Sequence, residues 1–209
     1  MRLPKTAHFS RPWRIHELTK DFELEDVWEL PTPGGPADLA RLVQQFSSFD
    51  EGDNELPVVS RALFAIRWKL GKLFGWDKPG FDIGERVHSL REQLPADLLE
   101  AARGPDLRAV PGRVDLEGPP VFSSVYQTYD EWVAEISNKT VHAVLHIGWV
   151  PDDSGGGYHA QMAVMVKPNG RFGKAYMAAI KPFRYAFVYP SLLRSIGRQW
   201  SLTHGRPTA

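Results

Sequence analysis

The chain has 209 residues, of which 43% are hydrophobic and 24% are charged, and this composition is typical of one globular domain. Its 25 basic and 25 acidic residues balance, so the chain carries no electrostatic footprint for nucleic acid. The absence of cysteine excludes disulfides, thiolate metal sites and thiol chemistry.

The N-terminal residues, MRLPKTAHFS, lack an apolar run long enough for a signal peptide. The longest apolar stretches also fall far short of the roughly 18 residues that are needed to span a bilayer. We therefore expect a single domain over residues 1–209, located in the cytoplasm, with no nucleic-acid partner and no membrane span.

The N-terminal half is predicted to contain two extended segments and three helical ones. Apolar and polar side chains alternate over 12–18, which predicts a short strand, and 22–30 predicts a second segment of extended or mixed structure. Helices are expected over 36–49 and, with a wide apolar stripe, over 57–74. A third helical stretch over 83–100 is interrupted by a proline.

The C-terminal half predicts a run of antiparallel strands followed by one long helix. The alternating segments are residues 121–129, 132–137, 140–150, 158–168 and 171–181. Residues 169–170, Asn-Gly, are a strong hairpin signal between the last two segments. Pro182 fits the first position of the helix, which is expected to run to about Trp200 with an apolar stripe.

The turn at residues 138–139 fixes which side chains share a face of the first hairpin. If these two residues form the whole turn, Ser137 pairs with Thr140, and one face of the hairpin is entirely apolar. The residues on that face are Trp132, Ala134, Ile136, Val141, Ala143, Leu145, Ile147 and Trp149.

The other face of this hairpin carries glutamates and histidines. The same register places Glu131 across from His146 and Glu135 across from His142. Two histidines four residues apart on a strand are separated by about 13 Å. Two bonds of about 2 Å each to one zinc ion cannot span that distance. We therefore interpret these residues as solvent-facing cross-strand pairs and expect no metal site.

The second hairpin predicts a face of small apolar residues. Its turn pairs Met162 with Met177 and Val164 with Ala175. Small residues and two methionines would leave room against a helix, and methionine adapts to ligands of different shapes. Plain close packing of the same residues is the alternative interpretation.

These elements predict an α+β fold in which a curved antiparallel sheet wraps around the long C-terminal helix, with additional helices in the N-terminal half. The helix covers the apolar face of the sheet and leaves a cavity beside it. The residues expected to line this cavity are Trp68, Trp132, Leu145, Trp149, Met162, Val164 and Met177. Ordinary core packing is the alternative role of the tryptophans.

Motifs of known catalytic and cofactor sites are absent from the sequence. It contains no GxSxG, HExxH or GxGxxG, and the loop at 152–157 lacks the Lys-Ser/Thr ending of a phosphate-binding loop. The residues predicted to face inward are apolar, whereas general acid–base catalysis needs a titratable group near the substrate. We therefore expect no cofactor and identify no catalytic residue.

Four segments carry a resemblance to a known family. They are SRPWRIHEL at 10–18, DFELEDVWELPTPGGP at 21–36, RALFAIRWKLGKLFGWD at 61–77 and AIKPFRYAFVYPSLLRSIGRQW at 179–200. The chain is thereby similar to the bacterial domain-of-unknown-function family 2867. That family resembles the START/polyketide-cyclase (SRPBCC) superfamily, which implies a helix-grip fold and binding of a lipid, polyketide or other apolar small molecule. The resemblance supplies no catalytic residue.

Three functions compete at this point. The first is binding of an apolar or aromatic small molecule in the cavity between the sheet and the C-terminal helix. The second is a cyclase or hydrolase acting in the same cavity, which predicts a polar side chain deep in the pocket with a perturbed pKa. The third is a protein-interaction module without a cavity, which predicts a filled core and an exposed apolar patch.

Overall fold

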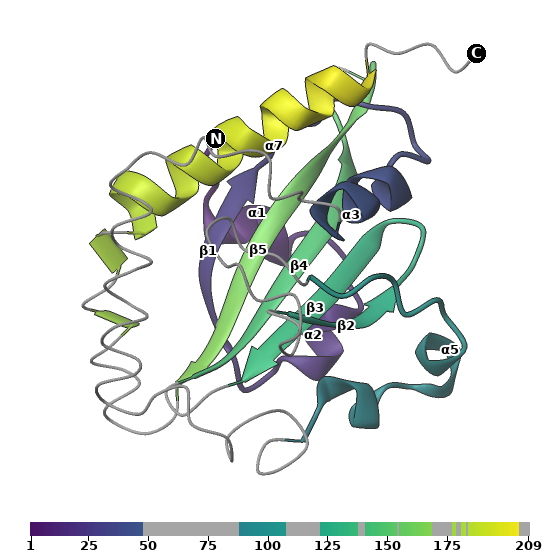
Figure 1. The fold of residues 1–209 in the computed structure, drawn as a ribbon. Coiled ribbons are helices and arrows are strands. Elements are labelled where there is room, and N and C mark those ends of the chain that lie inside the picture. Colours follow the sequence, from purple (N-terminus) through teal and green to yellow (C-terminus); the bar gives the residue numbers. More distant parts are fainter. Residues whose placement is uncertain are drawn as a thin grey trace.

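The computed structural model describes residues 1–47, 88–107, 122–137, 141–153, 155–168, 177–178, 181–182 and 184–204. Over these residues the chain has an α+β fold, as predicted, built on a curved, open, antiparallel sheet with the strand order β1-β5-β4-β3-β2. The C-terminal helix α7 (Tyr189–His204) crosses one face of this sheet (Figure 1).

The strands of the sheet agree closely with the sequence pattern. They are β1 (Glu23–Glu29), β2 (Ser123–Gln127), β3 (Glu131–Ser137), β4 (Val141–Pro151) and β5 (Tyr158–Pro168). The extended segment predicted over 22–30 and the first four strands predicted in the C-terminal half are confirmed. β1 pairs with β5, so the earliest and the latest of these strands are neighbours.

Short helices flank the strands. They are α1 (Lys5–Phe9), α2 (Ile15–Leu18), α3 (Leu39–Ser47), the 3-10 turn η1 (Leu90–Gln93), α5 (Ala96–Leu99) and the π-helical turn η2 (Arg184–Val188). The helix predicted over 36–49 is confirmed as α3, whereas the one predicted over 57–74 lies outside the described residues. In the described part of the chain, no helix is long and apolar enough to cross a membrane.

The strand predicted over 12–18 is wrong, because the chain forms the helical turn α2 there. Trp13 and Ile15 are buried, as alternation would require of a strand. Leu18 packs in the same cluster, however, and one helical turn brings residues three apart to the same side.

The helix predicted over 182–200 is confirmed, with η2 in place of its first regular turns. Pro190 stands in the first turn of α7. Because η2 directly precedes α7 and proline has no N–H to donate to that turn, Pro190 stands at the change from π-helical to α-helical geometry.

The pairing of β3 with β4 differs from the predicted register by two residues. Ser137 pairs with His142 rather than with Thr140. Because side chains alternate with a period of two, this shift leaves every residue on its predicted face. The joining residues 138–140 lie outside the described part of the chain.

The predicted pairing of residues 171–181 with β5 is wrong, and most of these residues lie outside the described part of the chain. A strand has only two edges, and those of β5 pair with β4 and with β1. The neighbour of Met162 on the β1 side is Trp28, so Met162 does not pair with Met177. Met177 itself has helical backbone, and the turn at 169–170 is not among the described residues.

The face of the sheet beneath α3 and α7, here called the helix side, buries large apolar residues. Trp132, Ile147 and Met162 of the strands pack with Leu42 of α3 and Ile196 of α7. This cluster is the core that fixes both helices on the sheet.

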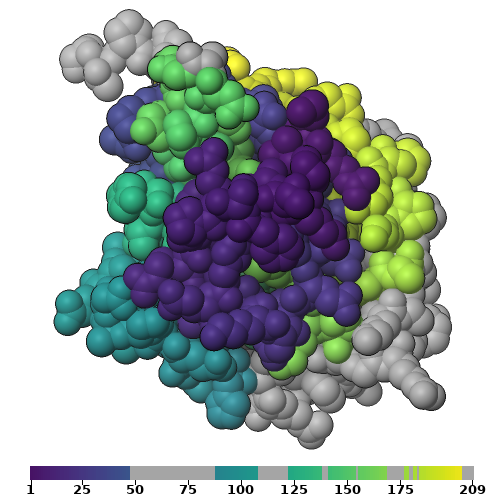
Figure 2. Space-filling model, turned by 180° about the vertical axis from the view of Figure 1, so that it is seen from behind, coloured from purple at the N-terminus to yellow at the C-terminus, as the bar shows by residue number. Residues whose placement is uncertain are grey.

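The opposite face, here called the N-terminal side, is buried as well. Figure 2 shows the purple N-terminal residues spread over it, with teal residues from the 88–107 region beside them. Apolar residues from these segments, Trp13, Ile15, Leu90, Leu94 and Leu98, pack in one cluster with residues of the strands. The polar residues on this face, Glu131, Glu135, His142 and His146, are at most 4% exposed, so the prediction that they face solvent is wrong.

Segments outside the sheet contact its two edge strands, β1 and β2. Along β1, the N–H of Leu3 donates to the carbonyl of Val27 at 2.9 Å. Along β2, the guanidinium of Arg91 donates to the carbonyl of Val125 at 2.7 Å. These contacts satisfy backbone groups that would otherwise pair with another chain.

Asp26 of β1 anchors the start of α7. Its carboxylate is 1% exposed and accepts hydrogen bonds from Arg184, Tyr185 and Tyr189. The Tyr189 hydroxyl lies 2.7 Å from Oδ2, and burial raises the pKa of this hydroxyl, so it remains a donor. A buried carboxylate is tolerated only when donors surround it, and here the donors tie the helix to the sheet edge.

Replacement of Asp26 by asparagine should lower the free energy of unfolding by about 3 kcal/mol, because it leaves the largely buried guanidinium of Arg184 without its carboxylate. Urea unfolding followed by circular dichroism measures the change. The matched control is Asp21→Asn, which breaks a surface ion pair with Lys167 and should cost under about 1 kcal/mol. Equal effects of the two substitutions would contradict the anchoring role of Asp26.

Candidate functional site

The helix side of the sheet has a covered end and a half-buried end. At the covered end, Trp132, Ile147 and Trp149 are buried in the cluster that includes residues of α3 and α7. At the other end, the apolar side chains of Ile136, Ala143, Leu145 and Val164 are only half-buried. Strand pairing makes these four residues neighbours, and they are called here the half-buried apolar patch.

The partial exposure of this patch is unusual for its position. β4 and β5 each have a strand on both sides, and their residues on the opposite face, such as Val144 and Met165, are at most 3% exposed. Val141, Val166 and Met177 form a small buried cluster beside the patch. The four side chains of the patch are all aliphatic, which suits contact with an apolar molecule.

The seven residues predicted to line a cavity are placed in three ways. Trp132, Trp149 and Met162 are buried in the core between the sheet, α3 and α7. Leu145 and Val164 belong to the half-buried apolar patch, and Met177 packs beside it. Trp68 lies outside the described residues.

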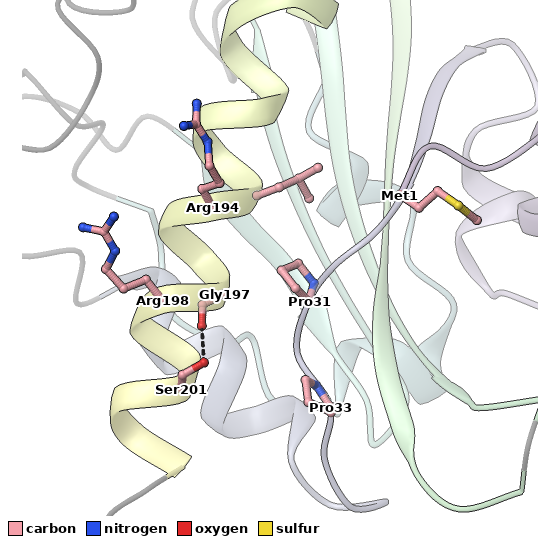
Figure 3. A pocket seen from close by; sticks show the side chains of 8 residues that line it. Met1, Pro31, Pro33, Arg194, Gly197, Arg198 and Ser201 are labelled. Atoms are coloured by element: carbon pink, nitrogen blue, oxygen red, sulfur yellow. Dashed lines mark hydrogen bonds between the residues drawn. The ribbon is translucent and has the colours of Figure 1, made fainter.

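A shallow groove runs beside α7 (Figure 3). Its volume is about 570 Å³, and it lies between α7 and the segment that follows β1. The lining residues are Met1, Pro31, Pro33, Leu193, Arg194, Gly197, Arg198 and Ser201. Gly197 permits the close approach of the two walls, because a Cβ atom there would lie 2.7 Å from Cγ of Pro31.

The groove is a weaker candidate for a ligand site than the patch. Sites for small molecules bury about 70–90% of the ligand surface, and this groove is open to solvent. The guanidinium of Arg194 donates to the carbonyl of Pro190 at 3.0 Å, which holds it along the helix surface. The groove therefore offers an apolar floor with basic residues at its rim, but little enclosure.

The buried polar residues of the N-terminal side form glutamate–histidine pairs. His142 Nε2 lies 2.8 Å from Glu135 Oε2, and His146 Nε2 lies 3.1 Å from Glu131 Oε2. The predicted partners are therefore correct, although the pairs are buried and run diagonally between the strands. Among the described residues, no group of three or more potential ligands could hold a metal ion.

Each of these glutamates also caps a helical turn. Glu131 Oε1 accepts the N–H of Arg14, the residue before α2, at 2.9 Å. Glu135 Oε2 accepts the N–H of Leu90, the first residue of η1, at 3.1 Å. Carboxylates are favoured at helix N-termini because the first N–H groups there have no partner within the helix.

A chain of three histidines continues from the Glu131 pair. His146 Nδ1 lies 3.2 Å from Nε2 of His8, and Nδ1 of His8 lies 3.0 Å from Nε2 of His16. His8 and His146 are fully buried, whereas His16 is half-buried. Burial, followed by the neighbouring His146 and His16, lowers the pKa of His8 to about 2, so this imidazole is neutral at physiological pH.

Sequence reasoning missed His8 and His16 as members of a buried cluster. No local pattern marks them, because His8 meets His146 only through a contact between residues 138 positions apart. The incorrect strand over 12–18 also gave His16 no defined neighbour.

Comparison with known proteins identifies the family of the chain and no individual relative. The model of the family described as a protein of unknown function, DUF2867, matches residues 18–191. No curated protein and no solved structure matches the chain. The matched range includes every strand of the sheet and the start of α7. The chain therefore belongs to the DUF2867 family.

Proposed function

We propose that the protein binds an apolar or aromatic small molecule at the half-buried apolar patch, on the side of the sheet that α7 crosses. The observation that carries this proposal is the partial exposure of four aliphatic side chains of β3, β4 and β5 at the half-buried end of the helix side. Each Å² of apolar surface left in contact with water costs about 25 cal/mol. A ligand that covers the patch removes this cost.

The order of the elements supports a helix-grip architecture as part of this proposal. The first strand pairs with the last strand of an antiparallel meander, and the long C-terminal helix crosses one face. The START/polyketide-cyclase proteins that the sequence resembles bind apolar molecules between such a sheet and helix. In this chain, tryptophans fill the covered end of that face, which leaves the other end for a ligand.

Binding without chemistry fits the patch better than catalysis does. General acid–base catalysis needs a titratable side chain within about 3 Å of the reacting atom, and the patch is aliphatic. Asp26 is a buried carboxylate on the same side of the sheet, but Arg184 and two tyrosines already engage it.

The neutral fluorescent probe N-phenyl-1-naphthylamine should bind to the protein and increase in fluorescence. The substitutions Leu145→Trp and Val164→Trp fill the patch and should each weaken binding at least tenfold, or about 1.4 kcal/mol. The matched control Leu193→Trp adds the same bulk to the groove beside α7 and should leave binding unchanged. Fluorescence titration gives the dissociation constants.

Two results would overturn this assignment. Full binding by both patch variants, with loss of binding in Leu193→Trp, would place the site in the groove. Failure of the wild-type protein to bind the probe, together with no thermal shift across lipids and polyketides, would favour the protein-interaction alternative.

Protein purified from its own host should carry an apolar ligand, because the side chains of the patch are partly exposed in the folded protein. Native mass spectrometry should show a mass excess that organic extraction removes and identifies. The Leu145→Trp variant from the same host should lack this excess. A mass excess that persists in Leu145→Trp would show that the ligand lies elsewhere.

A further inference from the structure

The residues Glu131, His146, His8 and His16 form one hydrogen-bonded row, here called the histidine chain. Its three contacts, of 3.1, 3.2 and 3.0 Å, use both ring nitrogens of His146 and both ring nitrogens of His8. One end is the carboxylate of Glu131, which is 2% exposed, and the other is the half-buried ring of His16. The row therefore leads from the interior to the surface of the N-terminal side.

For neutral rings, the protonation state of Glu131 fixes the tautomer of each imidazole in the histidine chain. When Glu131 is ionised and His146 is neutral, His146 donates from Nε2, and its Nδ1 accepts the Nε2–H of His8. By the same rule, Nδ1 of His8 accepts the Nε2–H of His16. When Glu131 is protonated, all three rings carry the proton on Nδ1 and every hydrogen bond runs the other way. Both states satisfy all three contacts with neutral imidazoles.

The surroundings of His8 and His16 favour the neutral form of these two rings. Burial and the two adjacent rings hold the pKa of His8 far below its usual value. Burial, followed by His146, also lowers the pKa of His16, against the opposing effect of Glu131. Proton movement through neutral imidazoles requires no lasting buried cation, which would be costly at this depth.

A shared metal ion does not explain the arrangement. His8 presents one ring nitrogen to His16 and the other to His146. The two nitrogens of one imidazole point in different directions, so a single ion cannot bind all three rings.

The other groups packed around the histidine chain cannot pass a proton to or from Glu131. Burial, followed by Glu131, raises the pKa of the buried Tyr126 hydroxyl, so this group stays protonated. The ring of Trp13 lies 5.1 Å from that of His146 and carries no titratable group. Arg14 meets Glu131 through its backbone N–H, while its guanidinium pairs with Asp97.

We propose that the histidine chain is a proton relay that loads and unloads the buried carboxylate of Glu131. A proton from solvent binds Nδ1 of His16, and the Nε2 proton of His16 moves to Nδ1 of His8. The Nε2 proton of His8 moves to Nδ1 of His146, whose own Nε2 proton moves to Oε2 of Glu131. One proton enters, one resides on Glu131, and all three rings end neutral.

Protonation of Glu131 through the relay weakens the hydrogen bond that holds the start of α2. Glu131 accepts the N–H of Arg14 at the start of this helix, and a protonated carboxyl is a weaker partner for that N–H than a carboxylate. The relay thereby links the proton concentration in solvent to the attachment of the N-terminal segment.

The neutral state of His8, on which the relay depends, predicts a pH dependence of stability. The pKa of His8 falls from 6.5 to about 2 on folding, so below pH 6.5 the unfolded chain binds a proton that the folded chain does not. The free energy of unfolding should therefore decrease as the pH is lowered from about 7 to about 5. Urea unfolding across this range should give a shallower decrease for His8→Gln, and equal slopes would contradict a neutral His8.

The tautomers are tested in the wild-type protein by ¹⁵N NMR of the imidazole rings. The relay requires the three rings to share one tautomer, with the proton on Nε2 of His16, His8 and His146 when Glu131 is ionised and on Nδ1 of all three when it is protonated. If His8 carried its proton on Nδ1 while His146 carried its proton on Nε2 at the same pH, neither ring could donate to the other. That result would overturn the relay.

The direction of proton entry is tested by hydrogen exchange of the His146 Nε2–H. In His16→Gln, the amide retains a polar contact but cannot pass a proton, so exchange should slow at least tenfold. The matched control His88→Gln alters an exposed histidine that pairs with Glu92 and should leave exchange unchanged. Circular dichroism confirms that each variant is folded. Unchanged exchange in folded His16→Gln would show that the proton leaves by local opening and would overturn the relay.

Discussion

The buried glutamates of β3 hold the N-terminal side of the molecule on the sheet. A carboxylate removed from water is destabilising unless several donors surround it. Glu131 obtains a donor from Arg14, and Glu135 obtains donors from Ser89 and Leu90. The donors come from segments far apart in the sequence, so both segments must dock before the two charges are satisfied. Apolar contacts alone would not fix the positions of these segments so closely, because they have no preferred direction.

A single glycine makes this docking possible at the centre of the sheet. Gly148 lies beneath Trp13, and a Cβ atom at this position would be 2.6 Å from Cζ2 of that ring. The missing side chain lets the residues before α2 lie close to β4. His8 and His146 then come within hydrogen-bond distance of each other. The polar network and the aromatic packing on this face consequently depend on the same small residue in β4.

The sequence predicted the strands well because their alternation has a period of two. A register error of two residues at Ser137 left the faces unchanged, so the partners Glu131 and His146 were still identified. Alternation cannot say whether a polar face meets solvent or another layer. The layer that buries it includes α2, which forms where the pattern over 12–18 had predicted a strand.

The parts of the sites that sequence reasoning did not identify depend on distant contacts. Asp26 has no local signal as an anchor, since its partners Arg184 and Tyr189 follow it by 158 and 163 residues. The alternating apolar pattern did place Leu145 and Val164 on the helix side, but it could not separate them from Trp132, which the core fills. That distinction depends on where α3 and α7 cover the sheet.

The two faces of β4 support different chemistry because successive side chains point in opposite directions. Leu145 faces the helix side, where the exposed surface is aliphatic, and His146 faces the buried polar network. The helix side therefore favours an apolar molecule that replaces water. On the N-terminal side, Glu131 is 2% exposed, and a row of neighbouring side chains that leads to the surface lets a buried carboxylate exchange its proton without local opening. The histidine chain supplies such a path, whereas the paired Glu135 and His142 adjoin no comparable row of described residues that leads to the surface.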